Sequence, residues 1–165
     1  MAIREILRYP DPRLTLRAAP VTMFDEALAA LVADLTETMQ AAPGVGITAP
    51  HIGVPLAVTV IALDPAAERR VYVNPQVIAT GPGTIRHVEG SVSMPGFTDE
   101  VERARPVTIR FQRLDGTQAE ETADGFMASC LQHEIDQING IFWINRLSRL
   151  RRDRLVKRAL KSSRG

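Results

Sequence analysis

The chain has 165 residues, of which 45% are hydrophobic and 24% charged, and its formal net charge is +1. This size and composition are typical of one globular domain with a buried core, so we expect a single domain over residues 1–165. No apolar run is long enough for a signal peptide or a membrane span, which predicts a cytoplasmic protein without a membrane partner.

The first predicted element is an amphipathic helix. Residues 23–42 place Leu28, Leu31 and further apolar residues at the i, i+3, i+4, i+7 spacing of a helix that buries one face. Asp25 is a plausible cap at its start. The helix is expected to end at Pro43.

The middle of the chain predicts strands. Residues 54–63 and 69–80 are rich in Val and Ile and bounded by Pro and Gly. Pro75 lies inside the second segment, which is therefore expected to be interrupted or to lie at a sheet edge. Residues 105–125 alternate apolar and polar side chains and contain Asp115 before a glycine, which predicts a hairpin turn.

Two helices are predicted at the C-terminal end. The first covers residues 125–137, with Gly140 as its terminator. The second, residues 144–165, has nine Lys and Arg against one acid, a net charge of +8 that leaves −7 elsewhere. Its apolar residues recur near helical spacing, so its cationic face is either solvated surface or a contact for a polyanion such as RNA. Strands between terminal helices predict an α+β fold.

The helical segment "MASCLQHEIDQ" nearly matches a metal-binding pattern. The H-E-x-x-H motif places two imidazoles on one helical face, with a glutamate beside the first. Here His133 and Glu134 are followed by Gln137 instead of a second histidine, and Cys130 shares their face. The segment is a metal site with an unusual ligand, a site that has lost its metal, or a buried histidine beside a glutamate. As the chain's only cysteine, Cys130 excludes an intrachain disulfide.

Two glycine-rich segments offer further polar groups. "APGVGITAPHIG" contains Val45, Gly46 and His51, and its glycines allow a close approach of backbone to a ligand or simply make turns. "HVEGSVSMPGF" contains Glu89 and Ser91 and is, by itself, a polar loop. It does not match the G-x-S-x-G pattern of serine hydrolases.

The order, spacing and flanking residues of these three segments resemble the polypeptide deformylase family. Its members carry G-x-G-x-A-A-x-Q, then E-G-C-[LI]-S, then Q-H-E-x-D-H, where this sequence has "GVGITAPH", "EGSVS" and "QHEIDQ". The resemblance covers essentially the whole chain, including "ILRYPDPRL", "VNPQVI" and "GIFWINRL". It implies a deformylase-like fold, with antiparallel or mixed sheets around a central H-E helix and a C-terminal helix.

The resemblance also implies the family's chemistry. A cysteine and two histidines hold a divalent metal, commonly Fe²⁺ and replaceable by Zn²⁺ or Ni²⁺. The corresponding ligand positions are Ser91, His133 and Gln137. The family's general acid and base is carried over to Glu134, and its oxyanion-stabilising glutamine to His51.

Further positions are carried over for substrate binding. The backbone N–H that helps to stabilise the oxyanion is that of Val92. Val45 and Gly46 belong to the backbone that pairs with the substrate peptide as an added strand. Glu89 and Cys130 are expected to line the same pocket.

Ser91 and Gln137 offer a neutral hydroxyl and a carboxamide where the family has a thiolate and an imidazole, so we predict that the usual metal centre is not retained. One alternative is a rebuilt site of His51, His133 and Glu134, to which Cys130 adds sulfur. A second alternative brings Ser91 within hydrogen-bonding reach of His133, either as an activated nucleophile or only to satisfy the imidazole.

Two functions follow from these expectations. The first is residual or altered hydrolysis of N-formyl or other N-acyl peptides, if a metal is still bound. The second is non-catalytic binding of peptide N-termini or nascent chains, or of the ribosome through the basic C-terminal helix.

Overall fold

The computed structural model describes residues 2–163 and contains three α-helices and five strands. The helices are α1 (Glu26–Ala41), α2 (Gly125–Ile138) and α3 (Arg149–Ser163). The strands are β1 (Gly46–Thr48), β2 (Val58–Ile61), β3 (Arg70–Glu89), β4 (Asp99–Gln112) and β5 (Gln118–Ala123). Short 3₁₀ turns cover Pro12–Thr15, Ala49–Ile52 and Trp143–Arg146.

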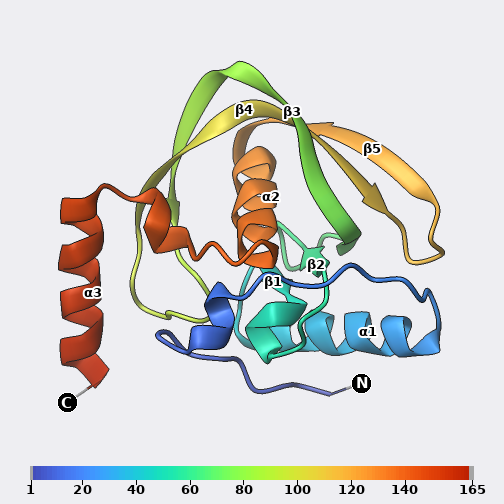
Figure 1. Cartoon of the computed structure of the whole chain (residues 1–165), viewed down its shortest axis with the longest axis horizontal. Helices are drawn as coiled ribbons and strands as arrows, with labels where there is room; N and C mark the ends of the chain where they lie inside the picture. The colour runs from blue at the N-terminus through green and yellow to red at the C-terminus, as the bar shows by residue number, and fades with distance from the viewer. Residues whose placement is uncertain (1, 164–165) are drawn as a thin grey trace.

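The five strands form one sheet in the order β1-β2-β3-β4-β5, and every neighbouring pair is antiparallel. β3 and β4 form a long curved ribbon that arches over α2, which stands at the centre of the molecule (Figure 1). The predicted α+β fold is confirmed, and its strands form an antiparallel sheet.

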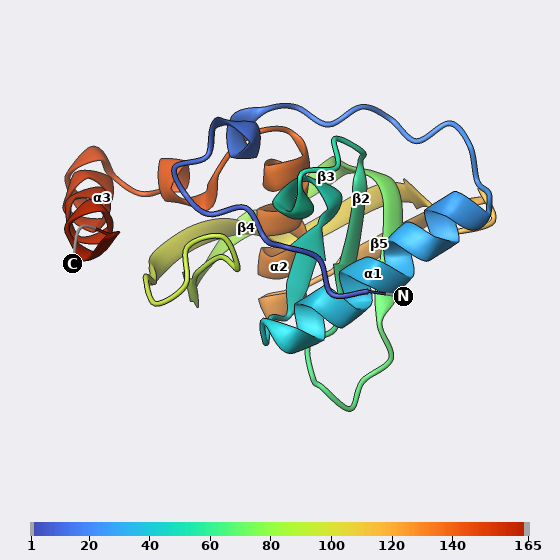
Figure 2. The same ribbon diagram turned by 90° about the horizontal axis from the view of Figure 1, so that it is seen from below.

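Strand β2 is buried on both faces because a helix covers each side. Val58 and Val60 pack with α1, while the alternate residue Ile61 packs with α2. Figure 2 shows β1 and β2 between the two helices. Burial on both faces explains why the sequence here is a continuous apolar run and not an alternating one.

Helix α1 has the predicted start. Asp25 is the N-cap, and its carboxylate accepts a hydrogen bond from the backbone N–H of Leu28 at 3.1 Å. Such a cap stabilises a helix by about 1 kcal/mol. The predicted face, with Leu28, Leu31 and Leu35, is buried.

Strand β3 extends further than predicted, and the interruption expected at Pro75 is present as an irregularity in its pairing with β4. It runs through Pro75 to Glu89, and its register with β4 shifts between Val73 and Gln76. Asn74 has a positive φ of 51° at this bulge. The irregularity accommodates a proline that has no N–H to donate to a ladder. The added length brings Glu89 to the site described below.

The remaining predicted turns are present. The hairpin between β4 and β5 turns at Gly116, which has a φ of 86° that glycine adopts readily. Helix α2 ends one residue later than predicted, and Gly140 follows it with a φ of 82°.

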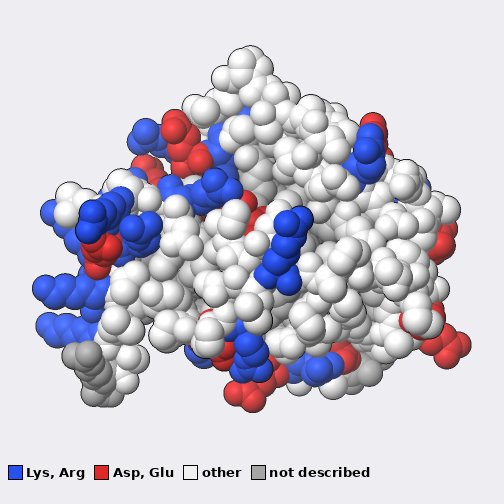
Figure 3. Space-filling model, viewed as in Figure 1, with Lys and Arg blue, Asp and Glu red and all other residues white. Residues whose placement is uncertain are grey.

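The basic C-terminal helix is shorter than predicted. α3 begins at Arg149, because residues 143–146 form a 3₁₀ turn that buries Trp143 and Ile144 in the core. The helix packs through Leu155 onto this cluster. Lys and Arg side chains gather over α3 at one end of the molecule (Figure 3). Residues 164–165 of the predicted helix lie outside the described residues.

No helix within residues 2–163 is long and apolar enough to cross a lipid bilayer.

Candidate functional site

A cavity of about 480 Å³ lies between α2, β1, the end of β3 and the loop that follows β3. The predicted site residues come to it from three distant parts of the chain. Nine of the ten line it: Val45, Gly46, His51, Glu89, Ser91, Val92, Cys130, His133 and Glu134. Gln137 is the exception.

Two residues of α2 bring an imidazole and a carboxyl into the cavity. The Nδ1 atom of His133 lies 2.8 Å from Oε1 of Glu89, and its Nε2 atom lies 3.6 Å from Oε1 of Glu134. A carboxylate only accepts hydrogen bonds, so His133 donates from Nδ1 to Glu89. The other ring nitrogen, Nε2, is therefore directed towards Glu134.

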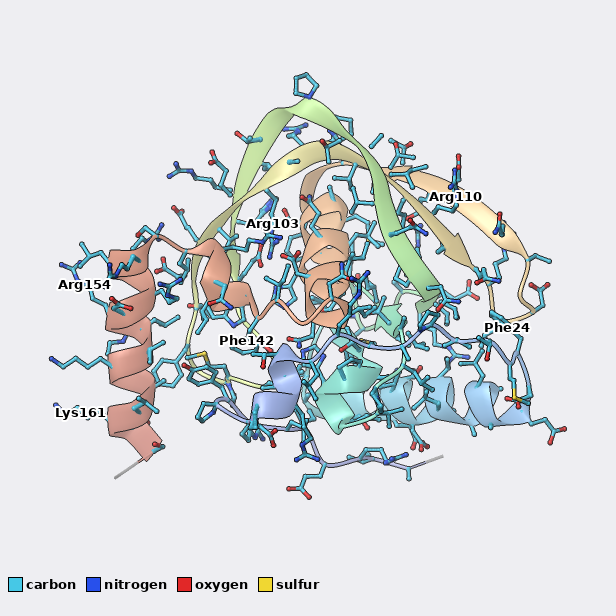
Figure 4. All side chains as sticks on the ribbon, in the orientation of Figure 1. Phe24, Arg103, Arg110, Phe142, Arg154 and Lys161 are labelled. Atoms are coloured by element: carbon cyan, nitrogen blue, oxygen red, sulfur yellow. The ribbon has the colours of Figure 1, made fainter. Side chains whose placement is uncertain are left out.

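A buried arginine holds Glu89 in place. Arg103 of β4 donates from Nε and Nη2 to the two oxygens of Glu89, at 2.9 and 2.8 Å, and from Nη1 to Asp136 at 2.6 Å. Arg146 adds two hydrogen bonds to Asp136, at 2.9 and 2.7 Å. Figure 4 shows Arg103 between the β3–β4 arch and α2. The chain of ion pairs fixes the orientation of His133.

These contacts set the charges around His133. Burial raises the pKa of Glu89, but hydrogen bonds from Arg103 and His133 outweigh it and lower this pKa to about 2. Burial lowers the pKa of His133, but the hydrogen bond to Glu89 and the charges of Glu134 and Glu89 raise it by more. Glu89 is therefore a carboxylate at neutral pH.

Glu134 is buried beside the imidazole of His133. Only 4% of its surface is exposed, and its Oε2 atom has no hydrogen-bond partner. Burial, with a smaller effect of Glu89, raises its pKa to about 7. A Cβ atom added to Gly46 would lie 3.1 Å from the carboxyl carbon of Glu134. Gly46 therefore leaves the space that this carboxyl group occupies.

His51 lies in the 3₁₀ turn after β1, and 1% of its surface is exposed. Its Nδ1 atom accepts a hydrogen bond from the backbone N–H of Thr48 at 2.9 Å and contacts the Thr48 hydroxyl at 2.9 Å. Its Nε2 atom is buried without a partner. Burial, with the nearby charge of His133, lowers the pKa of His51 to about 3, so the ring is neutral at pH 7.

Gln137 does not reach the cavity, so the expectation that it lines the pocket with His133 is wrong. Its Nε2 atom donates to the carbonyl of Leu14 at 2.7 Å. This contact ties α2 to the N-terminal segment. Helical spacing placed Gln137 on the correct side of α2, but it did not reveal which segment packs there.

Ser91 lines the cavity, and its hydroxyl makes a hydrogen bond within its own loop. Its hydroxyl accepts a hydrogen bond from the backbone N–H of Ser93 at 3.0 Å. Within residues 2–163, no hydrogen bond joins Ser91 to His133. The predicted serine–histidine pair is therefore not formed in either version, as a nucleophile or as a partner for the imidazole.

The mouth of the cavity is apolar and borders a free strand edge. β1 is the first strand of the sheet, and within residues 2–163 it pairs with β2 alone, so its other edge carries no strand there. Val45, Val88 and Phe126 line the cavity and are 40%, 61% and 42% exposed. An open edge beside exposed apolar side chains is the arrangement that accepts an extended peptide as an added strand.

The comparisons with known proteins agree with this arrangement. The family model described as polypeptide deformylase matches residues 3–153. The chain belongs to the polypeptide deformylase family. A "Peptide deformylase-like" protein of Agrobacterium fabrum is 60% identical over 162 residues, covering 98% of each chain. A "Peptide deformylase" of Phenylobacterium zucineum is 43% identical over 164 residues, covering 98% of this chain and 97% of its own.

The deformylase fold is confirmed as well. The crystal structure of a peptide deformylase from Legionella pneumophila is similar to this chain with a TM-score of 0.92 and 42% sequence identity. The match covers 99% of this chain and 96% of that protein. The central H-E helix and the C-terminal helix implied by the resemblance are both present as α2 and α3.

The residues at the three deformylase ligand positions do not fit the family's metal. The amide of Gln137 is hydrogen-bonded to the carbonyl of Leu14, and the Ser91 hydroxyl is a neutral, weak ligand. Of the three ligand positions, only that of His133 offers an imidazole. Burial, together with Glu134 and Glu89, raises the pKa of the Cys130 thiol to about 12, so this thiol is neutral at pH 7 in the metal-free site. Within residues 2–163, no group of three or more His, Cys, Asp or Glu could hold a metal ion.

Two residues of this deformylase-family site were not found from the sequence. Arg103 was missed, although it follows Val101 at an inward-facing position of β4, where an arginine needs buried acidic partners. Thr48 was missed because its effect on His51 depends on the conformation of the turn. An arginine at an inward-facing strand position, such as Arg103, can be detected in the sequence. No sequence pattern indicates the contact between Thr48 and His51.

Proposed function

We propose that this deformylase-family protein binds the N-termini of N-formylated or otherwise N-acylated peptides without the family's metal-dependent hydrolysis. The observation that supports the proposal is the hydrogen bond from Gln137 to the Leu14 carbonyl, because Gln137 is the one of the three family ligand positions that does not line the cavity. The cavity, its apolar mouth and the edge of β1 that is unpaired within residues 2–163 support the binding of a peptide.

Residual hydrolysis is a second candidate, and one observation favours it. Histidines that bind metals usually donate their second N–H to a carboxylate or carbonyl. His133 has this arrangement, because its Nδ1 faces Glu89 and its Nε2 faces the side of Glu134. The buried carboxyl of Glu134, with a pKa of about 7, is suited to accept a proton near neutral pH.

We further propose that α3 contacts the ribosome, so that the cavity meets nascent chains. Arg158 of α3 lies 5.9 Å from the ring of Phe97, and Phe97 lines the cavity. Arg154 and Lys161 are exposed on the outer side of the helix (Figure 4). Several arginines on one face are suited to contact RNA phosphates.

The test combines binding, metal content and activity. Protein purified without chelator or added metal is expected to bind formyl-Met-Ala-Ser in calorimetry but to contain far less than one metal per chain by elemental analysis. Deformylation after incubation with Fe²⁺, Ni²⁺ or Zn²⁺ is expected to stay at background. The control is a triple variant, His51→Gln, Ser91→Cys and Gln137→His, which is expected to bind metal and to deformylate the peptide.

Two results would contradict the proposal in different ways. Near-equimolar metal with deformylation by the unmodified protein would make it a working deformylase. Failure to bind formyl-Met-Ala-Ser, while the triple variant does bind it, would show that the cavity alone does not recognise such peptides.

A further inference from the structure

Arg8 brings an exposed cation to the wall of the cavity. It belongs to the N-terminal segment before the first 3₁₀ turn, and it is exposed although it lines the cavity. The acidic residues of the same wall, Glu89 and Glu134, are both buried, and Glu89 is already paired with Arg103. An arginine side chain stays protonated in proteins. Within residues 2–163, the opening of the cavity therefore carries a positive charge that no exposed acidic side chain of the wall balances.

Three hydrogen bonds fix the position of Arg8. The backbone N–H groups of the residues on either side of it donate to the carbonyls of His51 and Ser93, both at 2.8 Å. Arg8 itself donates from Nη1 to the carbonyl of Val92 at 3.0 Å. The N-terminal segment thus joins the 3₁₀ turn after β1 to the loop after β3. The guanidinium is therefore anchored at one nitrogen beside the cavity.

The edge of the Arg8 guanidinium formed by Nε and Nη2 makes no hydrogen bond or ion pair within residues 2–163. Elsewhere in the chain this edge is filled by carboxylates. Arg13 and Arg105 each donate from Nε and Nη2 to an aspartate, Asp11 and Asp124 respectively, at 2.8 to 3.1 Å. The planar fork of an arginine matches the two oxygens of a carboxylate. Arg8 offers the same fork without an acidic partner from the described part of the chain.

The later residues of a bound peptide leave the cavity through its opening. His51 and Glu134 line the buried interior, and exposed lining residues such as Arg8 mark where the cavity meets solvent. An extended peptide advances about 3.3 Å per residue, and the cube root of the cavity volume of about 480 Å³ is about 8 Å, so two or three residues cross it. When the acylated N-terminus lies at the buried groups, the second or third residue is therefore near the exposed wall.

We propose that Arg8 binds a carboxylate group of the bound peptide, so that the cavity prefers acidic over neutral peptides. The inference rests on the proposed function and adds the class of peptide that is recognised. The carboxylate comes from an Asp or Glu side chain at the second or third position of the peptide, or from the C-terminus of a tripeptide. Because the mouth of the cavity is otherwise largely apolar, an ion pair there is less screened than in bulk water.

The experiment compares two matched pairs of peptides by calorimetry with the intact protein. The first pair is formyl-Met-Ala-Ser and its C-terminal amide, which differ in the terminal carboxylate. The second pair is the amides of formyl-Met-Asp-Ser and formyl-Met-Asn-Ser, which differ in a side-chain carboxylate. At low ionic strength, the acidic member of at least one pair is expected to bind roughly 3 to 10-fold more tightly. The pair that shows the preference identifies the source of the carboxylate.

Variants of Arg8 assign the preference to its side chain. The ratio of the two affinities is expected to fall to about 1 in Arg8→Gln, which removes the charge, and to be largely retained in Arg8→Lys, which keeps it. The matched control is Arg4→Gln in the same segment, because Arg4 pairs with Asp34 and does not line the cavity. This control should leave the ratio unchanged. Added salt is expected to reduce the ratio in the unmodified protein, since exposed ion pairs are screened.

Three outcomes are distinguished. Equal affinities within both pairs for the unmodified protein, or a preference that Arg8→Gln retains, would overturn the inference. A role of Arg8 limited to holding the Val92 carbonyl would also overturn it, because Arg8→Gln would then weaken both members of a pair alike. Failure of all four peptides to bind the unmodified protein would instead count against the proposed function.

Discussion

Glu89 has both of its carboxylate oxygens engaged, by Arg103 on one side and by Arg103 and His133 on the other. The residue therefore acts on the site by holding His133, not by contacting a ligand with a free oxygen. Its pKa of about 2 measures how strongly these partners favour the charged form.

The lowered pKa of Glu89 predicts a stability that depends on pH. In the unfolded chain its pKa returns to about 4.5, so the unfolded state binds a proton first as the pH falls. The stabilisation, about 3 kcal/mol, is complete above pH 4.5 and is lost between about pH 4.5 and pH 2. A Glu89→Gln variant should be less stable at pH 6, and the difference should shrink as the pH approaches 3.

The measurement for Glu89 is urea denaturation of both proteins at a series of pH values. Other carboxyl groups titrate in the same pH range. Their contribution cancels in the difference between the unmodified protein and the Glu89→Gln variant, because both proteins contain them. A difference in unfolding free energy that is the same at pH 6 and pH 3 would show that Glu89 is not held by these contacts.

At the scale of elements, α3 combines two unlike faces. Leu155 is 3% exposed and packs on the cluster around Trp143, while the opposite face is cationic. Removing the Leu155 side chain would destabilise the packing, but changing an outer arginine should not, because a solvated charge contributes little to stability. Binding and stability can therefore be separated on this helix.

An Arg154→Glu substitution tests the proposed ribosome contact. It should weaken the binding of purified ribosomes and reduce the salt dependence of that binding, while the unfolding free energy changes by less than about 0.5 kcal/mol. The matched control is Arg17→Glu, because Arg17 is also exposed and lies far from α3 in the sequence. Equal effects of the two substitutions in cosedimentation at low and moderate salt would reject α3 as the contact.

The local pattern of the sequence was sufficient to predict most of the helices and strands. α1, α2 and the β4–β5 hairpin follow from helical spacing, capping residues and a glycine turn, which depend on neighbours in the chain. The interruption at Pro75 was also predicted, but the continuation of β3 beyond it to Glu89 was not. A bulge is stabilised by the partner strand β4, which the local sequence does not contain.

At the scale of the whole molecule, the ion-pair chain joins β3, β4, α2 and the turn before α3. Arg103 is 5% exposed and lies at its centre between Glu89 and Asp136. Removing one partner of a buried pair leaves uncompensated charge, which costs far more than loss of an exposed pair. The same strand provides an exposed pair for comparison.

An Arg103→Ala substitution should lower the unfolding free energy by about 3 to 5 kcal/mol. Arg110→Ala, on the same strand, removes a pair with Glu120 in which both side chains are about half exposed, and should cost less than about 1 kcal/mol. Urea denaturation at neutral pH measures both. Similar losses for the two variants would mean that the buried chain contributes no more than a surface pair.

The family motifs also placed most of the expected residues around one cavity. The hydrogen-bond partners of individual side-chain atoms were harder to predict. Nine of the ten expected residues line one cavity, because the family motifs specify which loops meet α2. Gln137 was misplaced because its partner, Leu14, lies 123 residues away in the sequence. Helical spacing gives the direction of a side chain but not the segment that packs against it.

The sequence by itself determined which chemical groups are present: a histidine and a glutamate on α2, a serine and a glutamine at two family ligand positions, and a second histidine after β1. The tertiary structure decided which of their atoms are free. Each polar atom makes a limited number of hydrogen bonds, and the partners come from distant segments or from turns. That is why Gln137 is hydrogen-bonded to the carbonyl of Leu14, while Nε2 of His51 has no hydrogen-bond partner within residues 2–163.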